Sequence, residues 1–301
     1  MGKTLYLECS AGISGDMSVA ALLDLGANES VLRAALASLP ADGFSIRVSR
    51  VKKAGLDACD FDVVLDAAHE NHDHDMAYLY GTPDEAIAHE HAHTHEDAHE
   101  HHHGHEHDHD HAHDRVHDHA HEHAHTHHHE HRSLTDVFAV IDAADITPGA
   151  RNVAHRIFDV LADAEASAHG VPRDEVHFHE VGAIDSIVDV VAFAVCFDDL
   201  GIDDVVVREL CEGEGSVRCQ HGVMPIPVPA VANIVSASGI PLRVLDVQGE
   251  LVTPTGAAIA AAVRTRADLP ERFVIKRTGL GAGKRDYATS GILRAMLIEE
   301  A

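Results

Sequence analysis

Lysine is scarce in this 301-residue chain, and the overall charge is strongly acidic. Asp and Glu number 50 against 22 Lys and Arg, and five of those basic residues are lysines. Proteins that bind nucleic acid need a basic face that displaces counterions from the phosphate backbone, so this composition argues against a nucleic-acid partner. The lysines are Lys3, Lys52, Lys53, Lys276 and Lys284.

The acidic excess also bears on the source of the chain. Salt screens the self-repulsion of a surface that is rich in carboxylates, so such a surface suits a cytoplasm of high ionic strength. We therefore expect a halophilic source. The alternative is that the surplus acid lies mainly beside the histidines, but acidic residues are also spread through the rest of the chain.

Cysteine is sparse and dispersed. The five cysteines form an odd-numbered set without a CxxC pair, which argues against a disulfide framework and favours a reducing cytoplasm. They are Cys9, Cys59, Cys196, Cys211 and Cys219.

Long apolar runs are missing. The first residues lack the apolar segment of a signal peptide. The longest apolar stretch, residues 187–197, is interrupted by Asp189 and is too short to span a bilayer. We expect a soluble protein without a membrane partner.

Nearly all the histidines lie in one internal stretch. All but five of the 30 fall within residues 69–131, where they alternate with Asp, Glu and Ala. Such low hydrophobicity predicts a disordered insertion. Neutral imidazole binds nickel, copper and zinc, so we expect this tract to hold several ions loosely. Representative ligands are His101, His103, His105, His107, His109 and His111.

Two other interpretations of the tract remain, and the metal is open. The tract could be a solvating spacer or an expression tag, although its internal position and interleaved acid argue against a tag. Imidazole affinity alone does not select nickel, because the general order favours copper.

The remaining sequence predicts a folded core of mixed strands and helices. Strands and helices alternate without a strict βαβ order, which favours an α/β or α+β fold with a mixed sheet flanked by helices. Residues 1–68 and 132–301 should form this core, separated by the insertion at 69–131. Strands are expected at 4–8, 44–53, 56–66, 176–180, 205–210, 243–247, 273–280 and 292–298. Helices are expected from about 16 and at 30–39, 133–145, 148–170, 185–200, 229–238 and 255–266.

Two motifs place glycine and hydroxyl residues at expected helix starts. In residues 9–17, Ser14 and Gly15 form a turn whose backbone N–H groups could face an anion, and Asp16 could cap the helix or bind a cation. In residues 250–258, Thr253, Thr255 and Gly256 suit a phosphate or carboxylate. Ordinary helix capping is the alternative for both motifs.

A third motif combines histidines with carboxylates. His177 and His179 would project from one face of a strand, and Asp185 and Asp189 would share one face of the following helix. Two imidazoles and nearby acids make a reasonable metal or acid/base site. The alternative is that Asp185 caps the helix and the histidines bond to the backbone.

A fourth motif, residues 213–230, is a glycine- and proline-rich loop before a helix. His221 and Cys219 could supply softer metal ligands, and Arg218 could meet a phosphate or carboxylate. Cys219 could equally be a small buried apolar residue. The glycines at 279–283 look like an isolated loop and are weak evidence of function.

Taken in order, these motifs resemble the LarC-type nickel insertion family, as represented by the N-terminal part of its members. The matching segments are residues 5–17, 177–189, 221–230 and 250–258, and a histidine-rich insertion is typical. The resemblance implies a metal chelatase of the lyase class, with nickel as the metal. The family inserts nickel into pyridinium-3,5-bisthiocarboxylic acid mononucleotide, and the resulting nickel-pincer cofactor serves a nickel-dependent racemase.

The resemblance also implies roles for particular residues. It places a metal path near His177, His179, Asp185, Asp189 and His221, with Asp16 nearby, and makes Glu180 the candidate base. Thr253, Thr255 and Gly256 would hold the phosphate of the precursor.

The length of the chain differs from that of the family. Full-length relatives continue into a C-terminal domain that uses CTP with Mg or Mn, whereas this sequence ends at Ala301. We expect either a separately encoded C-terminal component or delivery of nickel without insertion. Two alternatives stay open: a nickel or zinc storage protein or metallochaperone, and a Thr/His/Asp hydrolase, for which no nucleophile motif exists.

Overall fold

The computed structural model describes residues 2–66, 76–80, 132–178 and 183–301. The chain divides into one compact unit of residues 1–80 and 129–301 and a second of residues 81–128. The predictions for the histidine tract therefore lie outside the described residues, except at positions 76–80. Those for His179 and Glu180 lie outside them as well.

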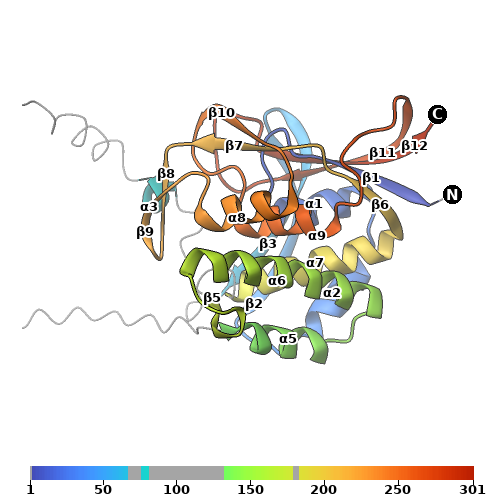
Figure 1. Ribbon diagram of the computed structural model, residues 1–301. Helices are drawn as coiled ribbons and strands as arrows, with labels where there is room; N and C mark the ends of the chain where they lie inside the picture. The colour runs from blue at the N-terminus through green and yellow to red at the C-terminus, as the bar shows by residue number, and fades with distance from the viewer. Residues whose placement is uncertain (1, 67–75, 81–131, 179–182) are drawn as a thin grey trace, which may run out of the picture. The chain divides into compact units, whose positions relative to one another are not determined.

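Within the described residues, six strands form a mixed sheet in the order β2-β3-β11-β12-β1-β6 (Figure 1). β1 runs parallel to β6 and antiparallel to β12, so the expected mixed sheet is confirmed. β1 and β12 lie side by side, which brings the two ends of the described chain together (Figure 1). The strands are β1 (Lys3–Glu8), β2 (Phe44–Lys53), β3 (Leu56–Leu65), β6 (Ile202–Val206), β11 (Phe273–Ala282) and β12 (Ile292–Glu300).

Shorter strands pair outside this sheet. The prediction of one strand at 205–210 is wrong, because the chain leaves β6 at Val206 and enters a different pairing at Leu210. Within residues 213–230, which were predicted as a glycine- and proline-rich loop, residues 216–225 form the β8–β9 hairpin. The pairs are β7 (Leu210–Glu214) with β10 (Leu242–Gln248), β8 (Ser216–Cys219) with β9 (Gly222–Pro225), and β4 (Arg132–Ser133) with β5 (His177–Phe178).

Two of the helices begin at residues that the sequence marks as caps. Ser133 forms a capping box with Asp136, and Thr147 caps the helix that opens at Pro148. That helix stops at Gly170, in the left-handed conformation. The helices are α1 (Gly15–Leu25), α2 (Glu29–Ala37), α3 (Met76–Tyr80), α5 (Leu134–Ala143), α6 (Pro148–His169), α7 (Ile184–Leu200), α8 (Pro229–Ser238) and α9 (Pro254–Val263), with a 3₁₀ turn at Arg173–Glu175.

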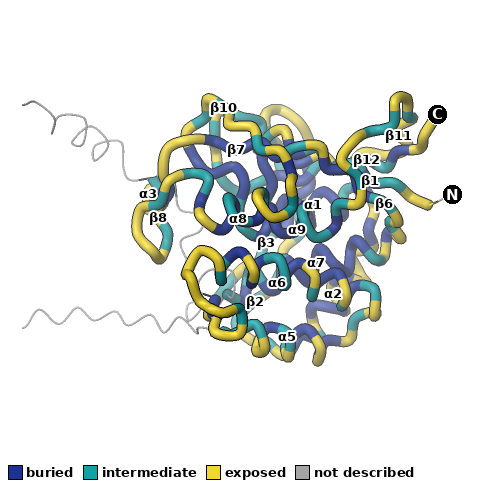
Figure 2. Tube along the Cα trace, in the orientation of Figure 1, coloured by how far each residue is buried: buried dark blue, intermediate teal, exposed yellow. Residues whose placement is uncertain are grey.

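The core lies around the most apolar helices. α1, α7 and α9 are buried along most of their length (Figure 2). Burial of this much aliphatic surface is the main favourable contribution to folding. Among the described residues, no helix is both long and apolar enough to cross a membrane.

Glycines in β11 let α1 approach the sheet closely. A Cβ atom at Gly279 would lie 2.2 Å from the carbonyl oxygen of Ala21, and one at Gly281 would lie 2.0 Å from that of Met17. The interpretation of residues 279–283 as an isolated loop is therefore wrong. Most of this segment belongs to strand β11. Because its glycines have no side chains, α1 can pack closely against the strand.

One short helix corrects the start of the insertion. Residues 76–80, which sequence reasoning assigned to the insertion, form α3 in the folded unit. The physical reason is that Met-Ala-Tyr-Leu-Tyr carries apolar side chains, of which Leu79 is 6% exposed and packs into the core.

Candidate functional site: a pocket at four helix starts

One pocket collects the first turns of α1, α7, α8 and α9. Its volume is about 300 Å³, at the lower end for small-molecule sites. Backbone N–H groups without a helical partner, together with the helix dipole, make such turns attractive to anions. The lining residues from these four turns are Ser14, Gly15, Asp16, Asp185, Ser186, Pro229, Ala230, Thr253, Pro254 and Thr255, and Asp189 joins them from the second turn of α7.

Backbone hydrogen bonds hold two of these turns together. The Ile13 N–H donates to the Leu251 carbonyl at 2.9 Å, and the Thr253 N–H donates to the Ile13 carbonyl at 3.1 Å. Gly256 permits this approach, because a Cβ atom there would lie 2.2 Å from the Ile13 carbonyl oxygen. Gly256 thus lies behind the pocket wall, whereas Thr253 lines the pocket and also caps α9 through the Gly256 N–H.

A buried carboxyl group supports the turn before α9. Oε1 of Glu212 accepts hydrogen bonds from the N–H groups of Gly213, Leu251 and Val252 at 2.8, 2.7 and 3.1 Å. Oε2 of Glu212 is buried and has no partner in the described structure. Burial raises the pKa of Glu212 to about 7, although the three N–H donors act in the opposite direction.

Three aspartates meet at the starts of α1 and α7. The Asp16 side chain accepts a hydrogen bond from the Ser14 hydroxyl, and the Asp16 N–H donates a hydrogen bond to Asp189. Oδ1 of Asp189 is buried without a hydrogen-bond partner among the described atoms. Burial raises the pKa of Asp189 well above its ordinary value, and the charges of Asp16 and Asp185 raise it further. Gly15 leaves room for this contact, since a Cβ there would lie 2.4 Å from Asp189 Oδ2.

Two basic side chains enter the pocket from the loop after β11. Lys284 forms an ion pair with Asp60, and its Nζ lies 3.5 Å from Asp62. Arg285 pairs with Glu250 at 2.6 Å. Burial alone would lower the pKa of Arg285, but Glu250 raises it above the ordinary value, so the guanidinium stays charged. The pocket therefore contains two cationic side chains, each held in place by a carboxylate.

The rim of the pocket carries nitrogen and sulfur donors. Cys219, His221 and Met224 on the β8–β9 hairpin line it, together with His169 at the end of α6. The rings of His169 and His221 have centroids 5.0 Å apart. Within the described ranges, no group of three or more His, Cys, Asp and Glu side chains is placed to hold a metal ion.

α3 forms a further part of the pocket wall. Leu79 lines the cavity, and the Tyr80 hydroxyl accepts a hydrogen bond from the Glu250 N–H at 3.0 Å. The Tyr80 and Tyr287 hydroxyl oxygens are 2.7 Å apart, so these two side chains are also joined. The residue that follows Tyr80 begins the second unit of the chain.

The pocket brings together most of the site residues predicted from sequence that the structure describes. His177 and Gly256 are the exceptions. His177 is exposed on β5, opposite Ser133, and does not line the cavity. Gly256 supports the wall from behind. Those that line the pocket are Ser14, Gly15, Asp16, Asp185, Asp189, His221, Thr253 and Thr255.

Sequence reasoning missed several lining residues. Lys284 and Arg285 directly follow the glycine segment that seemed uninformative, and a basic pair in a lysine-poor chain was the available signal. His169 appeared only as the end of a helix, and α3 was hidden inside the histidine-rich stretch. Asp62 on β3 and Glu165 on α6 also line the pocket. Long-range packing brings these two elements together, so no local sequence pattern identifies the two residues.

The nickel insertion protein family model matches residues 5–301 of the chain. The chain belongs to this family. It is 47% identical, over its whole length, to the pyridinium-3,5-bisthiocarboxylic acid mononucleotide nickel insertion protein of Alkaliphilus metalliredigens, covering 61% of that protein. The proteins of the same name from Clostridium acetobutylicum and Acetivibrio thermocellus are 41% and 34% identical. The matches cover 99% and 98% of this chain, and 64% and 60% of those proteins.

The chain thus spans about three fifths of the length of these curated relatives. No solved structure matches it. Family membership identifies nickel as the metal that such proteins handle.

Proposed function

We propose that this chain binds pyridinium-3,5-bisthiocarboxylic acid mononucleotide and Ni²⁺ and takes part in joining them. The observation that carries the proposal is the pocket itself, where four helix starts and two basic side chains surround a group of aspartates. The named substrate has a phosphate and two thiocarboxylate groups, so it needs several anion-binding positions. The pocket offers such positions beside carboxylates that attract a divalent cation.

The phosphate is assigned to the turns before α1 and α9. Ser14, Gly15, Thr253 and Thr255 line these adjoining turns, which the Ile13 hydrogen bonds hold together. A helix start favours an anion by roughly 0.3–1 kcal/mol at an exposed site and by more when partly buried. Lys284 and Arg285 add positive charge to the same cavity.

Nickel is the second substrate. Imidazoles of the histidine tract hold the ion loosely, and the thiocarboxylate sulfurs, which are softer ligands, draw it away. One carbon–nickel and two sulfur–nickel bonds form while the ring C–H bond breaks. The C–H electron pair stays on carbon to form the bond to Ni²⁺, and the proton leaves to a base, so no oxidant is needed.

A carboxylate is the proposed base. Glu180 is the candidate taken from the sequence, and it lies outside the described residues. Within them, Asp189 fits best, because its Oδ1 is buried at the pocket without a partner among the described atoms. Asp16 and Asp185 lie beside it and would attract the metal. His177 and His179 stay candidate metal ligands from the sequence.

Other parts of the reaction lie beyond this chain's pocket. We assign CTP, with Mg²⁺ or Mn²⁺, to a C-terminal component like the one expected from the resemblance, and a nickel-dependent racemase to the role of recipient. The dispersed cysteines favour a cytoplasmic location for the reaction.

Storage or metallochaperone activity without insertion is the second candidate, and the histidine tract favours it. Removal of residues 81–128 separates the two functions. This deletion spares α3, which belongs to the folded unit. Storage should be lost with the tract, whereas insertion should persist at high supplied nickel.

Mass spectrometry tests the leading proposal. The full chain, a relative's C-terminal component, CTP, Mg²⁺, Ni²⁺ and the mononucleotide would be incubated and the nucleotide products analysed. The proposal expects a product heavier by one nickel and lighter by the protons released, and an Asp189→Asn variant should form it much more slowly. Unchanged product formation by Asp189→Asn would remove Asp189 from the reaction, and no product from the unaltered protein would contradict the proposal.

A further inference from the structure

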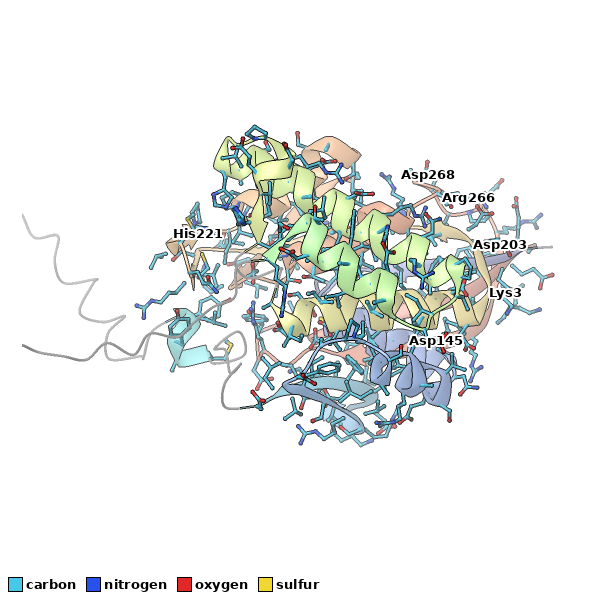
Figure 3. The ribbon with its side chains drawn as sticks, turned by 90° about the horizontal axis from the view of Figure 1, so that it is seen from below. Lys3, Asp145, Asp203, His221, Arg266 and Asp268 are labelled. Carbon is cyan, nitrogen blue, oxygen red and sulfur yellow. The ribbon has the colours of Figure 1, made fainter. Side chains whose placement is uncertain are left out.

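Two imidazoles from distant parts of the sequence meet at the rim of the pocket. His169 ends α6, and His221 lies in the turn of the β8–β9 hairpin. Figure 3 shows His221 at the end of the molecule where the hairpin lies. We propose that His169 and His221 form a transfer site that receives Ni²⁺ before the mononucleotide does, an inference that rests on the function proposed above.

The spacing of the rings fits one shared ion. Their centroids lie 5.0 Å apart, and the planes are tilted by 47°. With a metal–nitrogen bond of about 2 Å and about 1.15 Å from that nitrogen to the ring centre, an ion shared by two rings lies about 3.15 Å from each ring centre. A centroid separation of 5.0 Å then corresponds to a nitrogen–metal–nitrogen angle of about 105°, once both rings turn a nitrogen toward the ion. This angle suits tetrahedral or cis-octahedral coordination.

A carboxylate beside His169 orients its ring. Oε2 of Glu165, one turn earlier on α6, lies 3.4 Å from Nε2 of His169. A carboxylate at the second nitrogen of a metal-binding imidazole fixes the ring and raises its basicity. Glu165 also lines the pocket, so this support belongs to the same site.

Two protein ligands suit transfer better than storage. An ion held by two imidazoles keeps its other coordination positions for water, and an incoming thiocarboxylate sulfur can replace that water. Sulfur is a softer ligand than imidazole for nickel, so the ion moves toward the substrate. A closed set of four protein ligands would hold the ion in place.

The hairpin that carries His221 also lies beside α3, the short helix near the start of the histidine-rich stretch. The Arg218 guanidinium stands over the Tyr78 ring, 5.8 Å from its centroid. The His169 side chain is 32% exposed, whereas Asp189 Oδ1 is buried. The two imidazoles therefore line a more exposed part of the pocket than the buried Asp189.

Histidine modification read by mass spectrometry tests this site in the full chain. Diethyl pyrocarbonate would be applied with and without Ni²⁺ in excess over the tract histidines, and each histidine peptide would be measured separately. We expect Ni²⁺ to slow modification of His169 and His221 about tenfold, equivalent to about 1.4 kcal/mol. His155 is the internal control, since it packs on Phe138, does not line the pocket and should be unaffected.

A single substitution tests whether the two rings share one ion. His221→Ala alters an exposed hairpin residue, so the fold should persist. In that variant Ni²⁺ should no longer protect His169. Protection of His169 that survives in His221→Ala, or nickel protection of neither residue in the unaltered chain, would overturn the proposal.

Addition of the mononucleotide, together with a relative's C-terminal component, CTP and Mg²⁺, separates this inference from the proposed function. Reversal of the protection would show transfer of the ion to the substrate. Protected histidines without any metallated nucleotide would leave the transfer site standing and contradict insertion. A metallated nucleotide that forms without protection of the two histidines would support insertion and contradict the transfer site.

Discussion

Glu250 and Arg285 form a buried ion pair, 2.6 Å between Oε2 and Nη1, in the wall between the main pocket and a smaller adjoining cavity of about 60 Å³. The side chains are 7% and 15% exposed. Glu250 is also held through its N–H by Tyr80, so one residue connects α3 with the basic loop after β11. The pair holds the Arg285 guanidinium in place beside the pocket.

Loss of one charge from this pair should be costly. Glu250→Gln removes the carboxylate charge from a buried guanidinium, and we expect the free energy of unfolding to fall by about 3 kcal/mol. Denaturant unfolding measures this change. Glu209→Gln is the matched control, because its pair with Arg243 is largely exposed and should contribute less than about 1 kcal/mol. Equal effects of the two substitutions would contradict the buried role of Glu250.

The stability of the protein should depend on the protonation of Glu212. Its pKa rises from 4.5 to about 7 on folding, so the folded state binds the proton more tightly. The associated stability is fully present below pH 4.5 and is lost as the pH rises to about 7, a difference of about 3 kcal/mol. Denaturant unfolding of the unaltered protein and Glu212→Gln at pH 5 and pH 8 isolates this contribution. The same pH dependence in both proteins would refute it.

Gly281 should tolerate no side chain. A Cβ atom at this position would meet the Met17 carbonyl oxygen at 2.0 Å and the Ala21 nitrogen at 2.6 Å, both in the backbone of α1. Gly281→Ala must push α1 away from the sheet, and we expect a loss of about 3 kcal/mol or more in denaturant unfolding. At Gly283 the nearest atoms belong to the flexible Met17 side chain, so Gly283→Ala should cost much less. A similar loss for both variants would contradict this packing.

The Tyr80 hydroxyl should hold α3 against the pocket. Tyr80→Phe removes the acceptor of the Glu250 N–H and the contact with Tyr287. We expect a loss of roughly 1–2 kcal/mol and faster hydrogen exchange at the Glu250 amide. Tyr6→Phe, in β1 of the main sheet, should leave this exchange rate unchanged. An unaltered rate in Tyr80→Phe would show that other contacts hold α3.

Local signals in the sequence predicted helix starts well and the assembly of the pocket only in part. Ser133, Thr147 and Pro148 act within a single turn, so their effect is visible in the sequence. The motifs around Asp16, Asp189 and Thr253 were recognisable, because each joins a loop to a helix start.

What the sequence could not show depends on long-range packing. His177 was expected near Asp189, but β5 pairs with β4, and this pairing joins residues far apart in the chain. His169 and His221 meet because α6 ends beside the β8–β9 hairpin, which no local pattern indicates. Gly281 seemed to mark a loop, because the helix that it accommodates lies far away in sequence.

Titration calorimetry with the mononucleotide tests the central claim most directly. The purified chain, without nickel, would be titrated with pyridinium-3,5-bisthiocarboxylic acid mononucleotide and, separately, with the nucleoside that lacks the phosphate. If the helix starts and basic side chains of the pocket bind the phosphate, the mononucleotide should bind about tenfold or more tightly than the nucleoside. Thr255→Val should reduce that ratio. Equal affinity for both compounds, or no binding of either, would contradict the account.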